Sequence, residues 1–419
     1  MSRRESETGT DTDNVRPPSE PHGRLAPEEP VATDPILSVR DLHVRFRSFR
    51  GTSQVIDGVD LSVGRGEVVT VAGETGCGKS VTMKTILGIL PRPPGVIPRG
   101  EVVFDGTKIL SLSEDELDEL KGRRIAMIAQ DPMSSLNPVY TVGEQLTDTA
   151  QFGGGSGGGP LDYLRRKRSS EREEARRRVE ELLREVRLPE PTEIMDSYPD
   201  QLSGGMRQRV MIAQALLNEP DLLIADEIGT ALDVTIHDQI QTLLEDLIEE
   251  RDLSVLMITH NLGAAREISD RIYVMYAGRI VETAPTERLF DAPQHPYTQG
   301  LLTSVPRLTG EEMAEGIPGY IPEYVEPPGG CRFHPRCPYA HDRCREEEPQ
   351  RYRQADSAAE CFLYDSDHEA PHDPPTVDET AERMVESTEG EPGTPEPVAD
   401  GGANERPEQA GDTPGGDRS

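Results

Sequence analysis

The stretch Gly73-Glu74-Thr75-Gly76-Cys77-Gly78-Lys79-Ser80 decides the fold. It matches G-x-x-x-x-G-K-S and lies between a predicted strand, Glu67 to Ala72, and a predicted helix from Lys79 to about Leu90. Glycines at this spacing let backbone N–H groups surround phosphate oxygens, and the helix N-terminus adds positive potential. Lys79 is expected to reach the β- and γ-phosphates and Ser80 to ligate Mg²⁺. All eight residues are therefore predicted to bind ATP.

Apolar runs on both sides of this stretch predict an α/β fold built on a parallel sheet. Short apolar strands alternate with helical patterns, and the region from about 139 to 220 is predicted to be helical. Gly153 to Gly159 is predicted to be a flexible surface loop, and Leu164 to Val186 a solvated helix. The other predicted elements are strands Leu37–Arg45, Val55–Val63, Asp221–Ala225, Val255–Thr259 and Ile272–Tyr276, and helix Ile236–Glu250.

Two adjacent carboxylates follow the apolar run that begins at Leu222. In open parallel sheets ligands bind beyond the carboxyl ends of the strands, which places Asp226 and Glu227 near the phosphates. Asp226 is expected to hold Mg²⁺, and Glu227 to orient and polarise the attacking water. The plainer alternative is a surface acidic pair after a buried strand.

A third motif, Leu202-Ser203-Gly204-Gly205-Met206-Arg207-Gln208, resembles the LSGGQ-type signature of ABC ATPases. A serine followed by two glycines at a helix start forms an anion-binding nest. The resemblance implies a P-loop NTPase (RecA-like) core with an ABC β-subdomain and a helical subdomain. It also implies that Ser203, Gly204, Gly205 and Met206 close over the γ-phosphate held by a partner subunit, so that two chains build each active site.

The same resemblance implies roles for further residues. Gln130 resembles the Q-loop glutamine that touches Mg²⁺ and water, and His260 resembles the switch histidine that contacts the γ-phosphate. Asp233, in Thr230-Ala231-Leu232-Asp233, resembles the D-loop aspartate at the dimer contact. Phe46 stands where an aromatic ring stacks on adenine; Phe49 competes for that role, and a plain packing role for Phe46 stays open.

The resemblance covers residues 35 to about 364, and its details are those of the oligopeptide/dipeptide importer branch. It implies a second ATP-binding subunit, forming a heterodimer, two membrane permease subunits and an extracellular solute-binding protein. It places the chain peripherally on the cytoplasmic face of the cell membrane. The stretches that carry it are Gln130 to Pro138, Leu202 to Ala215, Val274 to Glu282 and His295 to Thr298.

Three alternatives stay open at this point. Close relatives import oligosaccharides or nickel chelates instead of peptides. Ile228-Gly229 replaces the usual Pro-Thr after the catalytic glutamate, and glycine frees the backbone that proline would fix, so the site could be a degenerate, non-hydrolysing partner. A soluble ABC ATPase outside transport is the third, although one phosphate motif and an acidic chain speak against it.

Composition sets the domain boundaries and the class of partner. The chain has 419 residues and a formal net charge of −33, which disfavours a nucleic-acid partner. Residues 365–419 hold 16 acidic and 3 basic side chains, so the remainder still carries −20, and a halophile's high-salt cytoplasm is one hypothesis beside that of an acidic mesophile. We expect disordered tails at 1–34 and 365–419, an ATPase domain at 35–290 (helical subdomain about 139–220), and a C-terminal extension at 291–364.

Four cysteines lie in that extension, namely Cys331, Cys337, Cys344 and Cys361. Four thiolates in a weakly apolar segment of a cytoplasmic protein favour a metal site over disulfides. Their spacing lacks the C-x2-C of most zinc sites, and similar extensions in this branch carry a cluster, so a four-iron four-sulfur cluster is predicted, with Zn²⁺ or no metal as alternatives. Cys77, near a helix N-terminus, is expected to react readily with alkylating agents and to be shielded by ATP.

Overall fold

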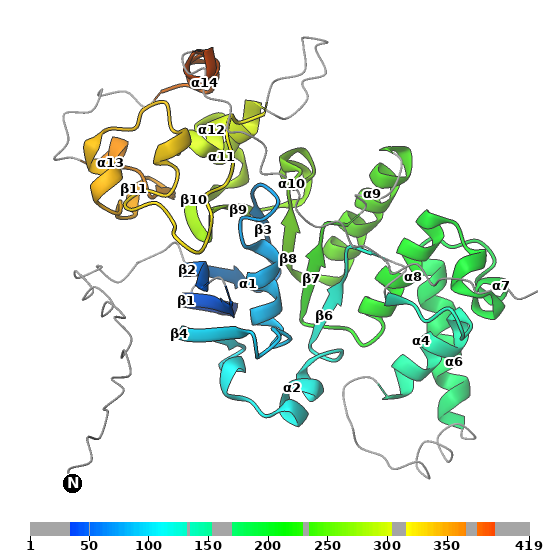
Figure 1. Cartoon of the computed structure of the whole chain (residues 1–419). Helices are drawn as coiled ribbons and strands as arrows, with labels where there is room; N and C mark the ends of the chain where they lie inside the picture. The colour runs from blue at the N-terminus through cyan, green and yellow to red at the C-terminus, as the bar shows by residue number, and fades with distance from the viewer. Residues whose placement is uncertain are drawn as a thin grey trace, which may run out of the picture.

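The computed structural model of the chain describes residues 34–49, 51–131, 135–152, 170–228, 234–303, 316–365 and 375–389. Within them one sheet has the order β11-β12-β10-β9-β3-β8-β7-β6 and a second the order β2-β1-β4-β5 (Figure 1). The strands are β1 Pro35–Ser48, β2 Gly51–Gly64, β3 Val68–Ala72, β4 Gly95–Phe104, β5 Thr107–Lys108, β6 Ile125–Ile128, β7 Leu222–Asp226, β8 Ser254–Thr259, β9 Arg271–Tyr276, β10 Arg279–Pro285, β11 Tyr352–Gln354 and β12 Ser357–Ala359.

Helices cover these sheets and form a lobe on one side of them. The helices are α1 Lys79–Ile86, α2 Glu114–Leu120, α4 Val142–Phe152, α6 Ser170–Glu185, α7 Pro191–Asp196, α8 Gly204–Leu216, α9 Val234–Arg251, α10 Leu262–Ile268, α11 Thr286–Asp291, α12 Pro296–Thr303, α13 Asp342–Glu346 and α14 Val377–Glu389, with 3-10 turns at Ile109–Ser111, Pro199–Gln201, His334–Arg336 and Phe362–Tyr364. In the described residues no helix is long and apolar enough to cross a membrane.

The centre of the larger sheet is parallel, as predicted. β3 pairs with β9 on one side and β8 on the other, and β7 and β6 follow in parallel register. Every residue of β3 and of β8 is buried, which explains why these strands read as continuous apolar runs. The carboxyl ends of five neighbouring parallel strands therefore meet at one edge, and this edge carries the candidate site.

Helix α1 follows β3 directly and packs into a hydrophobic cluster shared with β1, β2 and the central sheet. It ends at Ile86, four residues before the predicted end. Gly88 has φ of 66°, and the N–H of Ile89 donates to the carbonyl of Lys84 at 2.9 Å, the bond of a Schellman C-cap. The helix thus ends early because Gly88 caps it, and hydrophobic periodicity alone does not reveal such a cap.

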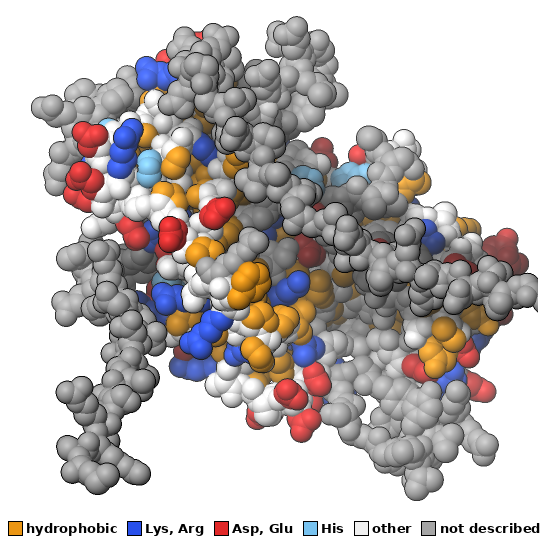
Figure 2. All heavy atoms as spheres, viewed as in Figure 1, with side chains coloured by type: hydrophobic (Ala, Val, Ile, Leu, Met, Phe, Trp, Pro, Cys, Tyr) orange, Lys and Arg blue, Asp and Glu red, His pale blue; other side chains and the backbone are white. Residues whose placement is uncertain are grey.

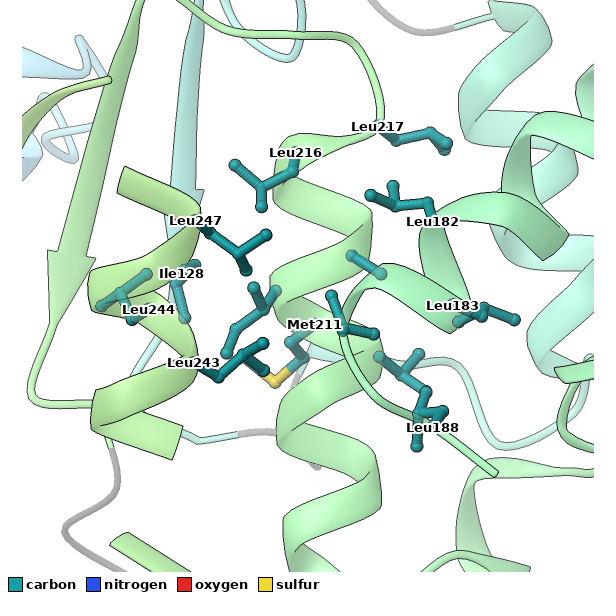
Figure 3. Packing of buried hydrophobic residues seen from close by; sticks show 14 of the residues in the cluster. Ile128, Leu182, Leu183, Leu188, Met211, Leu216, Leu217, Leu243, Leu244 and Leu247 are labelled. Atoms are coloured by element: carbon teal, nitrogen blue, oxygen red, sulfur yellow. The ribbon is translucent and has the colours of Figure 1, made fainter. Parts of the chain in front are cut away.

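The helical subdomain predicted at about 139–220 is present as α4, α6, α7 and α8. Leucines from α6 pack against one side of α8, and leucines of α9 pack against the other (Figure 3). The predicted solvated helix is found as α6, and the glycine-rich loop lies outside the described residues. On the face shown in Figure 2 basic side chains gather over the antiparallel sheet and acidic ones lie to either side.

The C-terminal extension packs onto the edge of the larger sheet opposite to the helical lobe (Figure 1). We call residues 316–365 the cysteine module. Its strand β12 pairs with β10, with Glu282 opposite Ala359, so the module continues the ATPase sheet.

The expected disordered tail from residue 365 is wrong for α14. Thr376 and Glu379 form reciprocal capping bonds at its start, and Thr380 donates to buried Gln299 of α12 at 2.5 Å. Val377, Thr380 and Met384 lie on one face at helical spacing and pack against α12 and its surroundings. The T-x-x-E capping pattern was the sequence signal for this helix.

Candidate active site

Gly73–Ser80, which we call the phosphate loop, turns directly from β3 into α1. Gly78 caps α1 with φ of 116°, a conformation that favours glycine. A Cβ on Gly73 would lie 2.2 Å from the carbonyl oxygen of Met275, so only glycine fits there. The Nζ of Lys79 donates to the carbonyl of Gly73 at 2.7 Å and of Glu74 at 3.1 Å. Thr75, Gly76 and Ser80 are exposed and free to meet a ligand.

Cys77 departs from the predicted reactivity. Its side chain is 0% exposed, packed in the cluster beneath the loop. Burial raises the pKa of its thiol, and the nearby Lys79 ammonium only partly opposes this effect. A buried, protonated thiol is a poor nucleophile, so the structure contradicts the expected ready alkylation. In sequence the helix N-terminus was visible, whereas the burial was not.

The two carboxylates stand at the end of β7. Asp226 is the last residue of the strand and is buried. Burial raises the pKa of Asp226, and the adjacent Glu227 charge raises it further, while Lys79 and Lys84 act in the opposite direction. Glu227 turns out of the strand with φ of 45°, and its N–H donates to the carbonyl of Ile258 in β8 at 2.8 Å.

Gln130 and His260 converge on the carboxylate of Glu227. The Nε2 of Gln130 donates to Oε2 at 2.7 Å, and the Nδ1 of His260 lies 3.0 Å from Oε1. Gln130 follows β6 and His260 follows β8, the two neighbours of β7. Three residues that are far apart in sequence thus hold one carboxylate at the edge where the phosphate loop also lies.

Ile228, which replaces the usual proline, packs against two hydrophobic clusters. A proline at this position would fix the backbone angle φ. In this chain the apolar packing of Ile228 holds the first residue of the turn instead. Gly229 and the predicted D-loop residue Asp233 lie outside the described residues.

The predicted adenine contact lies near the end of β1. Phe46 pairs with Ser53 of β2 and is half-buried against the core beneath the antiparallel sheet. Its competitor Phe49 is 96% exposed. Because the ring of Phe46 is partly exposed and partly packed, its position is compatible with stacking on adenine and with a plain packing role.

The signature residues form the start of α8, in the helical lobe. The hydroxyl of Ser203 accepts a bond from the N–H of Met206 at 3.3 Å and caps the helix. A Cβ on Gly205 would lie 2.8 Å from Ile236 of α9, so glycine lets the two helices approach. α8 lies on the other side of β6 and β7 from α1 in Figure 1, and this chain does not bring its own signature onto its own phosphate loop.

The four cysteines of the module lie in or near three short elements, namely the turn His334–Arg336, helix α13 and the turn Phe362–Tyr364. All four of its cysteines line one small cavity, together with the rings of His295, Phe333 and Phe362. The backbone N–H of Cys331 donates a hydrogen bond to the carbonyl of Cys344 at 2.8 Å. Within the described residues, no three His, Cys, Asp or Glu side chains are close enough to hold a single metal ion.

Three further side chains, which no sequence motif indicated, hold the phosphate loop. Tyr297 accepts from the N–H of Glu74 at 2.9 Å, Tyr324 donates to the carbonyl of Gly76 at 2.5 Å, and Arg336 pairs with the carboxylate of Glu74. Tyr297 lies in His295 to Thr298, a stretch that resembles the oligopeptide/dipeptide branch but indicates no chemistry. Nothing in sequence distinguished Arg336 from the other arginines of the extension.

A phosphate loop, an acidic pair and a separate signature helix on this fold define a P-loop nucleoside triphosphatase. The family model "ABC transporter" matches residues 56–229, and "Oligopeptide/dipeptide transporter, C-terminal region" matches residues 281–344. The oligopeptide transport ATP-binding protein OppD of Bacillus subtilis is 43% identical over 77% of this chain and 87% of its own length. The dipeptide transport ATP-binding protein DppD of Escherichia coli is 42% identical over 75% of this chain and 92% of its own length.

Among solved structures, the dimeric post-hydrolysis state of the ATP-binding cassette MJ0796, bound to ADP and Pi, matches with a TM-score of 0.51 and 28% identity. The match covers 60% of this chain and 98% of that one. This chain belongs to the ATP-binding subunits of ABC transporters, in their oligopeptide/dipeptide branch. It is an ABC-type ATPase.

Proposed function

We propose that this chain supplies the energy for importing oligopeptides or dipeptides. The C-terminal extension carries the proposal, because residues 281–344 match the family model of that branch and continue the sheet of the ATPase. Relatives at 42–43% identity are named for dipeptide or oligopeptide transport.

Uptake in cells tests the cargo. Cells that lack this chain are expected to lose uptake of a labelled tripeptide, and the wild-type chain is expected to restore it. Uptake of a labelled oligosaccharide and of a nickel chelate serves as the control. Loss of either of these with intact peptide uptake would replace the peptide proposal by the corresponding alternative.

Each catalytic group has a proposed task. Glu227, oriented by Gln130 and His260, positions and polarises the attacking water, and His260 also contacts the γ-phosphate. Ser80, Gln130 and Asp226 offer the hydroxyl, amide and carboxylate oxygens that suit Mg²⁺, which would neutralise phosphate charge when bound. The raised pKa of Asp226, due to burial and to Glu227, fits a place where a cation offsets crowded negative charge.

Two chains are proposed to close around two ATP molecules. The separation of the Ser203 nest from the phosphate loop of the same chain supports a signature that acts on the partner's nucleotide. The dimeric relative supports the same arrangement. The partners we propose are a second, different ATP-binding subunit, two permease subunits and an extracellular binding protein, which place this chain on the cytoplasmic face of the membrane.

We also propose that the cysteine module binds a four-iron cluster. Its cavity is lined by all four thiols. His295, 1% exposed, accepts a bond from the N–H of Tyr297 at Nδ1, so its Nε2 carries the proton, and that atom is buried without a protein partner. Such a donor at a cavity of thiols fits a ligand with acceptor sulfurs.

The arrangement of the potential ligands favours a cluster over one ion. With Zn–S bonds of about 2.3 Å, a single Zn²⁺ holds its four sulfurs within about 4 Å of one another. In the described residues no three potential ligands are placed to hold a single ion. A four-iron cluster binds four thiolates at the corners of a cube, so its ligands need not meet at one metal centre.

Anaerobic reconstitution with ferrous iron and sulfide is expected to give about four iron atoms per chain, with broad visible absorption. Replacing any of Cys331, Cys337, Cys344 or Cys361 by serine should lower the iron content, because each supplies one ligand. Cys77→Ser is the matched control and should keep full iron. One Zn²⁺ per chain and no stable iron would contradict the cluster.

The acidic composition supports a further hypothesis, adaptation to a high-salt cytoplasm. A melting temperature that does not rise with KCl concentration would leave an acidic mesophile as the better description.

A further inference from the structure

One loop of the cysteine module reaches the phosphate loop. Cys331 and Cys337 flank the 3-10 turn His334–Arg336, and Arg336 points out of this turn towards Glu74. Both Nη atoms of its guanidinium donate to the carboxylate of Glu74, Nη1 to Oε2 at 2.7 Å and Nη2 to Oε1 at 3.1 Å. A bidentate pair of this kind fixes orientation as well as distance.

Arg336 is held from all sides, so it can act as a rigid brace. Its side chain is 4% exposed. Nε donates to the carbonyl of Pro318 at 2.7 Å, Nη2 donates to that of Ile317 at 2.8 Å, and the guanidinium lies over the ring of Tyr276, 5.7 Å from its centroid. A side chain with its donors satisfied within the protein has little freedom to move away from Glu74.

Two tyrosines hold the backbone of the same loop. Tyr297, at the start of α12, accepts from the N–H of Glu74, and Tyr324 of the cysteine module donates to the carbonyl of Gly76. These bonds set the direction of peptide units on both sides of Thr75. Because the phosphate cradle is made of backbone N–H groups, their direction decides whether phosphate fits.

A second arginine next to a cysteine, Arg332, holds the neighbouring strand β2. Arg332 donates to the carbonyl of Ala277 and, at 2.8 Å, to Oδ2 of Asp57 in β2. The N–H of Gly278 in turn donates to the carbonyl of Cys77 at 2.7 Å. The segment between Cys331 and Cys337 is therefore connected to the nucleotide site twice, through Arg336 and through Arg332.

We propose that Arg336 is a positioning residue for the phosphate loop, and that the cysteine module controls nucleotide affinity through the Arg336–Glu74 pair. Arg336 neutralises a carboxylate that would otherwise repel phosphate, and it holds the loop in its open cradle. Cys331 and Cys337 flank the turn that carries Arg336, so a ligand that joins these cysteines would hold that turn in place. The inference goes beyond the proposed function and does not depend on which metal is bound or which cargo is carried.

Coupling between two sites is reciprocal. If an ordered module favours ATP, then bound ATP must favour an ordered module by the same factor. Alkylation of the module's cysteines in the metal-free chain should therefore slow when ATP is added. An unchanged rate at saturating ATP would overturn the coupling.

The decisive measurement is the Kd of a fluorescent ATP analogue for the full chain. Arg336→Gln is expected to weaken binding roughly 5- to 30-fold, and Arg336→Lys to weaken it less, since one charge remains without the bidentate geometry. In a double-mutant cycle with Glu74→Gln the two effects should not add, because both changes break one pair. Cys337→Ser should weaken binding in the wild-type chain and add little to Arg336→Gln.

Arg343→Gln is the matched control. Arg343 also pairs with acidic residues of the module, Glu347 and Asp365, neither of which belongs to the phosphate loop, so this variant should leave Kd within about twofold of wild type. An equal loss in Arg343→Gln, or an unchanged Kd in Arg336→Gln with native circular dichroism, would overturn the proposal. If Arg336→Gln does not fold, the Kd values of Glu74→Gln, Cys337→Ser and the double variant are compared instead. Additive effects of the two substitutions on Kd would then overturn the proposal.

Discussion

Replacing Glu227 by glutamine is expected to lower ATP hydrolysis roughly 100-fold or more while leaving ATP binding intact. The variant keeps the size of the side chain and can still bond to Gln130 and His260. It removes the negative charge that polarises the attacking water, and phosphoryl transfer depends mainly on positioning and charge. Hydrolysis should therefore stop with ATP still held.

The geometry explains why this effect should be large. Glu227 takes a φ of 45°, which is uncommon outside glycine, and its carboxylate is gripped at 2.7 Å by Gln130 and at 3.0 Å by His260. Strained backbone and converging side chains at a strand end are typical of a preorganised site. His260→Ala should cost less than Glu227→Gln, because Gln130 still orients the carboxylate.

Steady-state hydrolysis and ATP retention in the paired complex are the measurements. Glu219→Gln is the matched control, an exposed glutamate that also has positive φ and pairs with Arg178 at the surface. It should hydrolyse ATP at about the wild-type rate. If Glu227→Gln also keeps the wild-type rate, Glu227 has no catalytic role, and the non-hydrolysing alternative suggested by Ile228-Gly229 is correct.

The Lys79→Ala variant is expected to lose ATP affinity roughly 100-fold and hydrolysis with it. Lys79 is the buried cation of the phosphate loop, and its Nζ already spans the loop through the carbonyls of Gly73 and Glu74. Without it the β- and γ-phosphates lose their charge partner. Asp226 also loses a cation that lowers its raised pKa.

Equilibrium binding of a fluorescent ATP analogue checks this result, and peptide uptake in cells checks its consequence. Lys84→Ala is the matched control, because Lys84 lies on the same helix but is exposed, and it should bind ATP within about twofold of wild type. Undiminished nucleotide binding in Lys79→Ala would refute the assignment of the phosphate loop.

Local patterns were sufficient for most of the core. The strand before Gly73, the acidic strand end at Asp226 and the helical region of α6 and α8 are all found where periodicity and flanking residues predict them. Each of these signals lies within about twenty residues of sequence, the range over which periodicity carries information.

Two of the differences between prediction and structure have local causes. Gly88 ends α1 early, and a capping box at Thr376 starts a helix in a segment whose acidity suggested disorder. The reactivity predicted for Cys77 failed for a different reason. Its burial depends on side chains of β1, β2 and β9 brought beneath the loop by folding.

The sequence by itself determined the class of chemistry, because the glycines, Lys79 and the strand-end carboxylates must follow one another closely to bind a phosphate. Only the tertiary structure decided which groups meet across the chain. Gln130 reaches Glu227 over 97 residues, and Arg336 reaches Glu74 over 262. Such pairs arise from strand order and from packing of the cysteine module on the sheet edge, and no short-range pattern encodes either.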